Sequence, residues 1–219
     1  MSEGLAIPLW TDLAAIGIGS LSGTVYATES RERRLDLLGI AIIGIAAGFG
    51  GGVIRDLMLS EVPAALQSNW YFPVAIAAAL LGILLEHVFR RLGHLVTTLD
   101  ALTLGVFGAV GTAKALSAGL PVVPAIFLGA VTAVGGSIIR DVLLGAPIAL
   151  MYVGSLYATG AIVGSAAFVG LTVLGVDMWV GAVVCIAVTF AVRMLAVAFG
   201  WSLPDPRSLR RGRGRPPAS

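Results

Sequence analysis

Long apolar stretches alternate with short polar segments along most of the chain. Each stretch is long enough to cross a bilayer as a helix, which takes about 20 residues. The seven stretches are 9–28, 36–60, 70–89, 97–117, 120–145, 149–172 and 177–200. The pattern predicts an all-α polytopic membrane protein with seven transmembrane helices in one domain, 1–203. Residues 204–219 are rich in Pro, Gly and Arg, and we expect them to form a disordered basic tail.

Composition strengthens the membrane prediction. Of the 219 residues, 58% are hydrophobic and 12% are charged, whereas soluble domains carry about 25% charged residues. The single cysteine, Cys185, cannot form an intrachain disulfide, and we expect it to be a buried apolar residue.

Basic residues between the stretches predict the orientation, because cytoplasmic loops carry an excess of Lys and Arg. Ten arginines fall on one side of a seven-helix arrangement: Arg31, Arg33, Arg34, Arg90, Arg91, Arg207, Arg210, Arg211, Arg213 and Arg215. On the other side lies a single lysine, Lys114. We therefore expect the N-terminus outside and the C-terminus in the cytoplasm, where the tail acts as an orientation anchor and does not bind nucleic acid.

The two halves of the chain repeat a motif. Residues 48–56, GFGGGVIRD, return as residues 133–141, AVGGSIIRD, and Asp12 has a counterpart in Asp100. The repeats cover about 9–89 and about 97–172. Since each holds three crossings, the second must enter the membrane in the opposite direction. The sequence therefore predicts two inverted three-helix repeats, with the seventh helix, about 177–200, outside them.

The small residues of the motif weaken a helix, because each Gly costs up to about 1 kcal/mol relative to Ala. They predict a kink or local unwinding in the second and fifth helices. The candidate kink residues are Gly50, Gly51, Gly52, Gly135, Gly136 and Ser137. Unpaired carbonyl groups there would have to face a cavity or neighbouring protein.

An Arg–Asp pair follows the small residues in each copy. Charges within a membrane helix cost a few kcal/mol and mark functional sites by default. Adjacent residues on a helix point about 100° apart, so we expect pairing between the copies, Arg55 with Asp141 and Arg140 with Asp56. Such pairs would either hold the two halves together or line a conduction path as a gate.

Other polar residues predict smaller roles. Asp12 and Asp100 begin predicted helices, where a carboxylate favours the N-terminus, and we expect both to act as caps. Lys114 is expected either to reach the interface or to repel cations at a pore mouth, and Arg193 to reach toward the interface. The sequence contains no paired-His motif, Walker loop or Gly-x-Ser-x-Gly, so we do not expect an enzyme.

The doubled motif, with the predicted repeats and seventh helix, resembles the prokaryotic trimeric intracellular cation (TRIC) channels, which belong to a wider set of glycine-transporter-like bacterial membrane proteins. The resemblance covers about 9–200. It implies a homotrimer in the bacterial inner membrane, with a K⁺-permeable pore in each subunit between kinked second and fifth helices. The residues it implies for the pore or gate are Arg55, Asp56, Arg140 and Asp141. It implies no cofactor or resident metal, only permeant monovalent cations and bound membrane lipid.

Three functions remain open from the sequence. The first is a passive cation channel in which carbonyl and hydroxyl groups such as that of Ser137 replace the hydration shell of the ion. The second is a secondary transporter of a small zwitterion such as glycine, because inverted repeats with broken helices are also typical of carriers. The third is a structural protein whose ion pairs only stabilise the fold.

Overall fold

The computed structural model describes residues 8–29, 35–91, 94–151 and 156–201, and these residues form helices, turns and no strand. The eight α-helices are α1 (Leu9–Glu29), α2 (Leu37–Met58), α3 (Tyr71–Leu84), α4 (Glu86–Arg91), α5 (His94–Ser117), α6 (Val122–Leu144), α7 (Tyr157–Val173) and α8 (Met178–Phe199). Two 3₁₀ turns, η1 (Ala64–Leu66) and η2 (Ala149–Met151), precede α3 and α7. The all-helical prediction is confirmed.

Four helices, α2, α5, α6 and α8, are long and apolar enough to cross a membrane, and α3 and α7 are shorter apolar helices. Two predicted stretches are wrong in detail. The stretch 70–89 is divided between α3 and α4 at Leu85, whose backbone N–H ends α3 by bonding to Leu81 and Ile83. The stretch 149–172 begins its long helix only at Tyr157, because Ala149–Met151 forms a 3₁₀ turn. The predicted tail, 204–219, lies outside the described residues.

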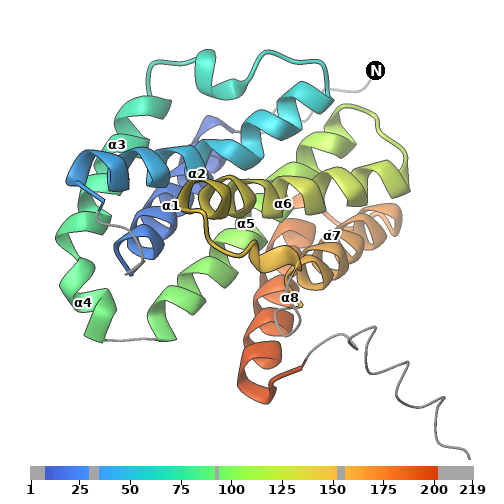
Figure 1. Cartoon of the computed structure of the whole chain (residues 1–219). Helices are drawn as coiled ribbons and strands as arrows, with labels where there is room; N and C mark the ends of the chain where they lie inside the picture. Colours follow the sequence, from blue (N-terminus) through green and yellow to red (C-terminus); the bar gives the residue numbers. More distant parts are fainter. Residues whose placement is uncertain (1–7, 30–34, 92–93, 152–155, 202–219) are drawn as a thin grey trace, which may run out of the picture.

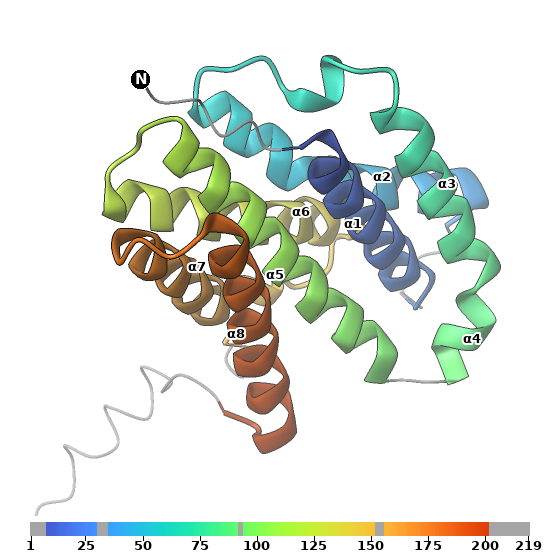
Figure 2. The same cartoon turned by 180° about the vertical axis from the view of Figure 1, so that it is seen from behind.

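The helices pack as two groups of three. In the first group α1 packs against α2 and α3, and in the second α6 packs against α5 and α7 (Figure 1). The groups meet where α2 packs on α6 and α1 packs on α5. Seen from behind, α5 runs through the middle of the molecule between α1 and α8, and α8 also packs on α7 (Figure 2).

Glycines allow α2 and α6 to approach closely. A Cβ atom at Gly51 would collide with the carbonyl oxygen of Thr132, and one at Gly136 would collide with that of Ala47. As the numbering rises along α2, the facing residue on α6 falls, so the two helices cross in antiparallel directions. Both are α-helical through these glycines, so the predicted local unwinding is not observed and small residues here serve close packing.

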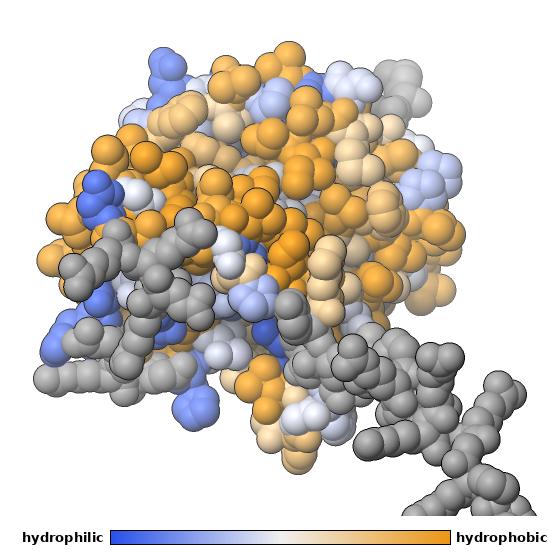
Figure 3. Space-filling model, viewed as in Figure 1, coloured by the Kyte–Doolittle hydropathy of each residue, from blue (hydrophilic) through white to orange (hydrophobic). Residues whose placement is uncertain are grey.

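The surface is largely apolar, as a bilayer requires. Exposed large hydrophobic residues occur on α1, α2, α3, α6, α7 and α8, among them Leu38, Leu80, Val123, Val183 and Phe199, whereas the central helix α5 carries none. Figure 3 shows apolar residues gathered across the middle of one face, with polar residues toward its edge. An apolar outer surface and buried charged residues invert the usual arrangement of a soluble domain, which directs attention to the charges inside.

Candidate functional site

The first buried charged cluster lies at the C-terminal end of α2. The guanidinium of Arg55 donates from Nε to Asp56 Oδ1 (2.7 Å) and from Nη1 to Asp12 Oδ1 on α1 (3.1 Å). Lys114 Nζ at the end of α5 lies 2.8 Å from Asp56 Oδ1 and 3.0 Å from Glu61 Oε2. Arg55 and Asp56 are only 2% and 1% exposed. We call Asp12, Arg55, Asp56, Glu61 and Lys114 site one.

Backbone and tyrosine groups complete site one. The second oxygen of Asp56, Oδ2, accepts from the backbone N–H of Ala64 in η1 at 2.7 Å. Tyr71, the first residue of α3, hydrogen-bonds to the side chain of Asp12. These bonds tie the turn after α2 and the start of α3 to the charged groups, so the carboxylates are held from several directions.

A second cluster lies at the C-terminal end of α6. Arg140 donates from Nε to Asp141 Oδ1 (2.9 Å) and from Nη1 to Asp100 Oδ1 on α5 (3.1 Å). The Tyr157 hydroxyl donates to the same Asp100 oxygen (3.1 Å), and Asp141 Oδ2 accepts from the backbone N–H of Ala149 in η2 (3.0 Å). Arg140 and Asp141 are 3% and 0% exposed.

Two further groups approach this second cluster. The guanidinium carbon of Arg140 lies 3.7 Å from the centroid of the Tyr26 ring at the end of α1. Arg193 of α8 lies 3.8 Å from Asp100 Oδ2 and stacks over Tyr157, 4.8 Å from the ring centroid. We call this cluster site two, and its members are Tyr26, Asp100, Arg140, Asp141, Tyr157 and Arg193.

The residues of the two sites correspond position by position, except for Glu61 of site one and Arg193 of site two. The corresponding pairs are Asp12 and Asp100, Tyr26 and Lys114, Arg55 and Arg140, Asp56 and Asp141, Ala64 and Ala149, and Tyr71 and Tyr157. Helices α1 and α5 each serve both sites, with one residue of the set near each end. Fourteen residues separate Asp12 from Tyr26, and Asp100 from Lys114, so about 21 Å of helix separates the sites.

The predicted pairing between the copies is wrong. Each arginine bonds to the aspartate that follows it and to a second aspartate, Asp12 or Asp100, on a neighbouring helix. The side chain of arginine is long enough to curl back to the next residue, although their Cα–Cβ bonds point about 100° apart. In addition, Arg55 and Arg140 each lie four residues beyond the glycines at which α2 and α6 cross. Because the two helices are antiparallel, the arginines lie on opposite sides of that crossing, away from the other copy.

Two further expectations need correction. Asp12 lies in the first turn of α1, but its carboxylate pairs with Arg55, and Asp100 lies within α5, 8% exposed. Neither carboxylate is engaged as a predicted cap. Arg193, predicted to extend toward the interface, is 8% exposed and faces site two. The Lys114 ammonium binds two carboxylates of site one, and its predicted role at a pore mouth stays a prediction.

The small residues of the motif divide between two faces. Gly50 and Gly51 of α2 approach Gly135 and Gly136 of α6. A Cβ at Gly52, in contrast, would meet only the far end of Arg55, 3.9 Å away. The remaining predicted kink residue, Ser137, donates to the backbone oxygen of Val134 (2.8 Å) and also hydrogen-bonds with Tyr157.

A small cavity accompanies each site. The cavity at site two, about 20 Å³, is lined by Asp100, Ser137, Arg140 and Tyr157 among others. The cavity at site one, about 10 Å³, is lined by charged residues of that site and by Tyr71. A cavity needs at least about 10–15 Å³ to hold one water molecule, so neither has room for more than one or two waters. The structure is closed to a hydrated ion.

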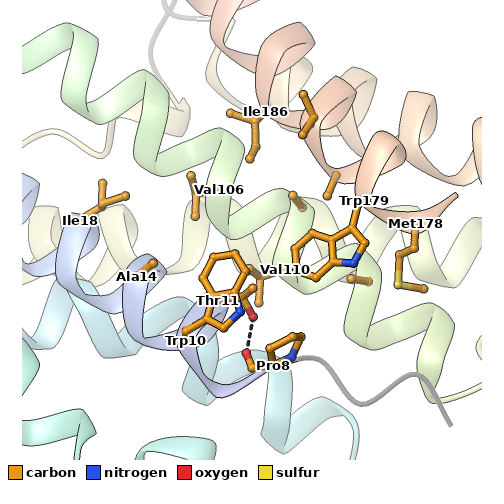
Figure 4. A pocket seen from close by; sticks show the side chains of 14 residues that line it. Pro8, Trp10, Thr11, Ala14, Ile18, Val106, Val110, Met178, Trp179 and Ile186 are labelled. Carbon is orange, nitrogen blue, oxygen red and sulfur yellow. Dashed lines mark hydrogen bonds between the residues drawn. The ribbon is translucent and has the colours of Figure 1, made fainter.

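Larger hollows lie elsewhere and are apolar. One of about 400 Å³ lies between α1, α5 and α8. Trp10 and Trp179 face one another in it, their rings stacked with centroids 5.5 Å apart, and Thr11 donates to the Pro8 oxygen (Figure 4). Another, of about 440 Å³, lies between α1 and α3. No ionisable side chain of the described residues lines either hollow, so neither provides a polar route.

Sequence reasoning missed several residues of the sites: Tyr26, Tyr71, Tyr157 and the inward placement of Arg193. A signal was present for the tyrosines. Tyr71 and Tyr157 stand 86 residues apart, close to the offsets of 85 and 88 that relate the other repeated residues. Arg193 lies outside the repeated segments, and no such correspondence marks it.

The chain is similar to known membrane proteins over most of its length. A model of the family described as "Glycine transporter" matches residues 9–87 and 97–173. A UPF0126 membrane protein of Streptomyces coelicolor is 40% identical over 215 residues, covering 98% of this chain and 97% of the relative. The UPF0126 inner membrane protein YadS of Escherichia coli K12 is 30% identical over 198 residues, covering 89% and 94%.

Solved structures share the fold. The TRIC trimeric intracellular cation channel orthologue from Rhodobacter sphaeroides has a TM-score of 0.80 and 28% identity, covering 88% of this chain and 98% of that one. A second TRIC cation channel, studied for its conductance, has a TM-score of 0.77 and 30% identity, covering 96% and 98%. Both are channels, and the Escherichia coli relative is an inner membrane protein, so the chain is a multi-pass inner membrane protein with the fold of a cation channel.

Proposed function

The chain belongs to the glycine transporter family of membrane proteins and, within it, to the TRIC channels, and on that premise we propose that it is a K⁺-permeable channel. The pore runs between α2 and α6, one in each subunit of a homotrimer. Seven crossings form two inverted three-helix repeats and a seventh helix, in a domain over 1–203. The cytoplasmic tail, 204–219, follows. Membrane lipid surrounds the trimer and fills its apolar hollows.

The burial of two ion-pair clusters at opposite ends of the α2–α6 crossing carries this proposal. Removing an ion from water costs several kcal/mol even after relaxation, and apolar side chains would pack a membrane protein without that cost. This cost arises at both site one and site two, which lie at opposite ends of the same crossing. A route with a polar group near each end suits an ion that sheds and regains its hydration shell.

In this closed state the charges nearly cancel within each site. Arg55 and Lys114 face three carboxylates, so site one carries a formal charge of −1, and site two has two arginines facing two aspartates. A cation passing either site therefore does not meet an uncompensated positive charge. Opening requires the ion pairs to exchange some of their bonds for water or for the ion.

The test is a recording from purified protein in a planar bilayer with KCl on both sides. We expect unitary currents of picoampere size that reverse near the K⁺ equilibrium potential when potassium gluconate is diluted on one side. Native mass spectrometry of the same sample should give three chains. Absence of current from a correctly assembled trimer would overturn the channel.

A secondary transporter of a small zwitterion such as glycine is the alternative, favoured by one observation. An arginine and an aspartate stand side by side next to the site-two cavity, and they would suit a carboxylate and an ammonium group. The cavity of about 20 Å³ is too small for glycine, so a carrier would require a larger opening. Saturable glycine uptake into vesicles, without unitary currents, would favour this function.

A further inference from the structure

Phe107 occupies the middle of the proposed path. It lies on α5, seven residues after Asp100 and seven before Lys114, which places it about 10 Å along the helix from each. Asp100 belongs to site two and Lys114 to site one. Phe107 lines both small cavities, the one that contains Arg140 and the one that contains Arg55. Its side chain is therefore a wall common to both.

Small residues surround the ring. A Cβ at Gly19 on α1 would lie 2.7 Å from Phe107 Cε2, and a Cβ at Gly51 on α2 would lie 3.4 Å from Cδ1. Ala15 belongs to the same buried cluster, and Phe107 itself is 4% exposed. The ring thus occupies space that α1 and α2 leave free by presenting residues with little or no side chain.

The position of the ring breaks the correspondence between the two halves. Gly19 stands 88 residues before Phe107, the offset that relates Asp12 to Asp100, and it lies midway between Asp12 and Tyr26. A second aromatic ring at Gly19 would meet the first, because the two positions are already in contact. A single ring therefore fills the centre for both halves.

We propose that the Phe107 ring is the apolar barrier of the path, and that its displacement joins the cavities of site one and site two. This inference rests on the proposed channel function. An apolar constriction stops ions by excluding the water that would hydrate them. Moving the ring away would leave a space bordered by Gly19 and Gly51, which have no side chains to fill it. Once the ring is displaced, an ion can enter the path and interact with the ion pairs at its two ends.

The test compares planar-bilayer currents of the unmodified channel with those of Phe107→Leu and Phe107→Ala. We expect open probability in KCl to rise with each reduction in side-chain size. The alanine variant should gain about tenfold, the effect of lowering a barrier by roughly 1.4 kcal/mol. The leucine variant keeps most of the apolar volume, so its open probability should lie between those of the unmodified channel and the alanine variant. It also provides the measurement if the alanine variant fails to assemble.

Phe168→Ala is the matched control. Phe168 on α7 is fully buried, packs with Ala109, Ala113 and Cys185, and lines neither small cavity. Its truncation removes an equal ring from the interior and should leave open probability unchanged. An equal rise in this control would mean general loosening and would overturn the inference.

The two proposals fail in different ways. If the unmodified channel conducts K⁺ and neither Phe107 variant changes open probability, the barrier is elsewhere and the channel function stands. If the unmodified protein and all variants form trimers but pass no cation, the channel function fails and the barrier with it.

Discussion

The Arg140 guanidinium lies 3.7 Å from the centre of the Tyr26 ring, and at the corresponding place in the other half the ammonium of Lys114 binds Asp56. The two sites share their Arg–Asp pairs and differ in this third partner. In site two the arginine faces a neutral aromatic ring, whereas in site one the aspartate gains a second cation.

Asp141→Asn should impair both stability and conduction. The carboxylate binds Arg140 and the backbone N–H of Ala149, and removing one partner of a buried ion pair costs up to about 3–5 kcal/mol. Thermal unfolding in detergent should show a lower midpoint, and bilayer recordings should show altered conductance or open probability. Asp56→Asn should act similarly at site one.

The control for these variants is Asp177→Asn. Asp177 is exposed and caps α8 by accepting from the backbone N–H of Trp179 (2.8 Å), and asparagine caps a helix about as well. Neither property should change. Buried-site variants that match this control in both measurements would show that the ion pairs neither line the path nor stabilise the fold.

Gly51→Ala should destabilise the protein, because the added methyl group would collide with the backbone oxygen of Thr132. Backbone atoms cannot rotate away, and overpacking of this kind typically costs about 1–3 kcal/mol. The measurement is the thermal unfolding midpoint of the purified trimer. Gly136→Ala should act alike, because its methyl group would meet the Ala47 oxygen.

Gly170→Ala should have the opposite effect on stability. Gly170 is exposed on α7, and nothing lies within 4 Å of its Cβ position, so alanine should stabilise by up to about 1 kcal/mol. If Gly51→Ala proved as harmless to stability as Gly170→Ala, that result would contradict the close crossing of α2 and α6.

Lys114→Met should raise K⁺ conductance in dilute salt. The substitution removes a cation from site one and leaves Asp56 and Glu61 without it, which makes that end of the path more negative. The Debye length falls from about 30 Å at 0.01 M to about 3 Å at 1 M, so the gain should disappear in concentrated KCl.

Glu61→Gln, at a half-exposed carboxylate, should lower conductance in dilute salt. Equal effects at both salt concentrations would exclude an electrostatic cause.

Topology can be measured with reporters fused to the C-terminus. A cytoplasmic C-terminus predicts that a fused green fluorescent protein is fluorescent and that a fused alkaline phosphatase is inactive in a bacterial host. Truncation before residue 177 removes the seventh crossing and should reverse both results. Phosphatase activity in the full-length fusion would contradict the orientation predicted from the arginines.

The helical architecture could be predicted from the sequence because apolar stretches near 20 residues have few alternatives in a bilayer. The repeat was also visible, since Arg55–Asp56 and Arg140–Asp141 occupy matching places. The pairing partners were not predictable in the same way. They depend on the antiparallel crossing of α2 and α6, which separates the two arginines, and on the reach of each side chain to Asp12 or Asp100. The effect of the glycines depends on the same crossing, because a glycine favours a bend or a close contact according to what faces it.

Phe107 shows a different limit of sequence reasoning. An aromatic residue in an apolar helix carries no signal of its own, and only the cavities on both of its sides distinguish it from Phe168. The direction of the Arg193 side chain was not predictable either. An arginine near a helix end can extend to water or toward the interior, depending on how the neighbouring helices pack. Its place at Asp100 follows from α8 packing on α5.

The two sites differ in formal charge, −1 at site one, which includes Glu61, and zero at site two, which includes Arg193, and this difference gives the path a direction. A cation approaching through site one meets a net negative mouth, whereas one approaching through site two meets a neutral one. With identical solutions on both sides, currents through a single subunit should therefore rectify, passing K⁺ more readily from the side of site one. A duplicated fold would be expected to conduct equally in both directions, and Glu61 and Arg193, charged residues that the other half does not repeat, are enough to give it a preferred direction.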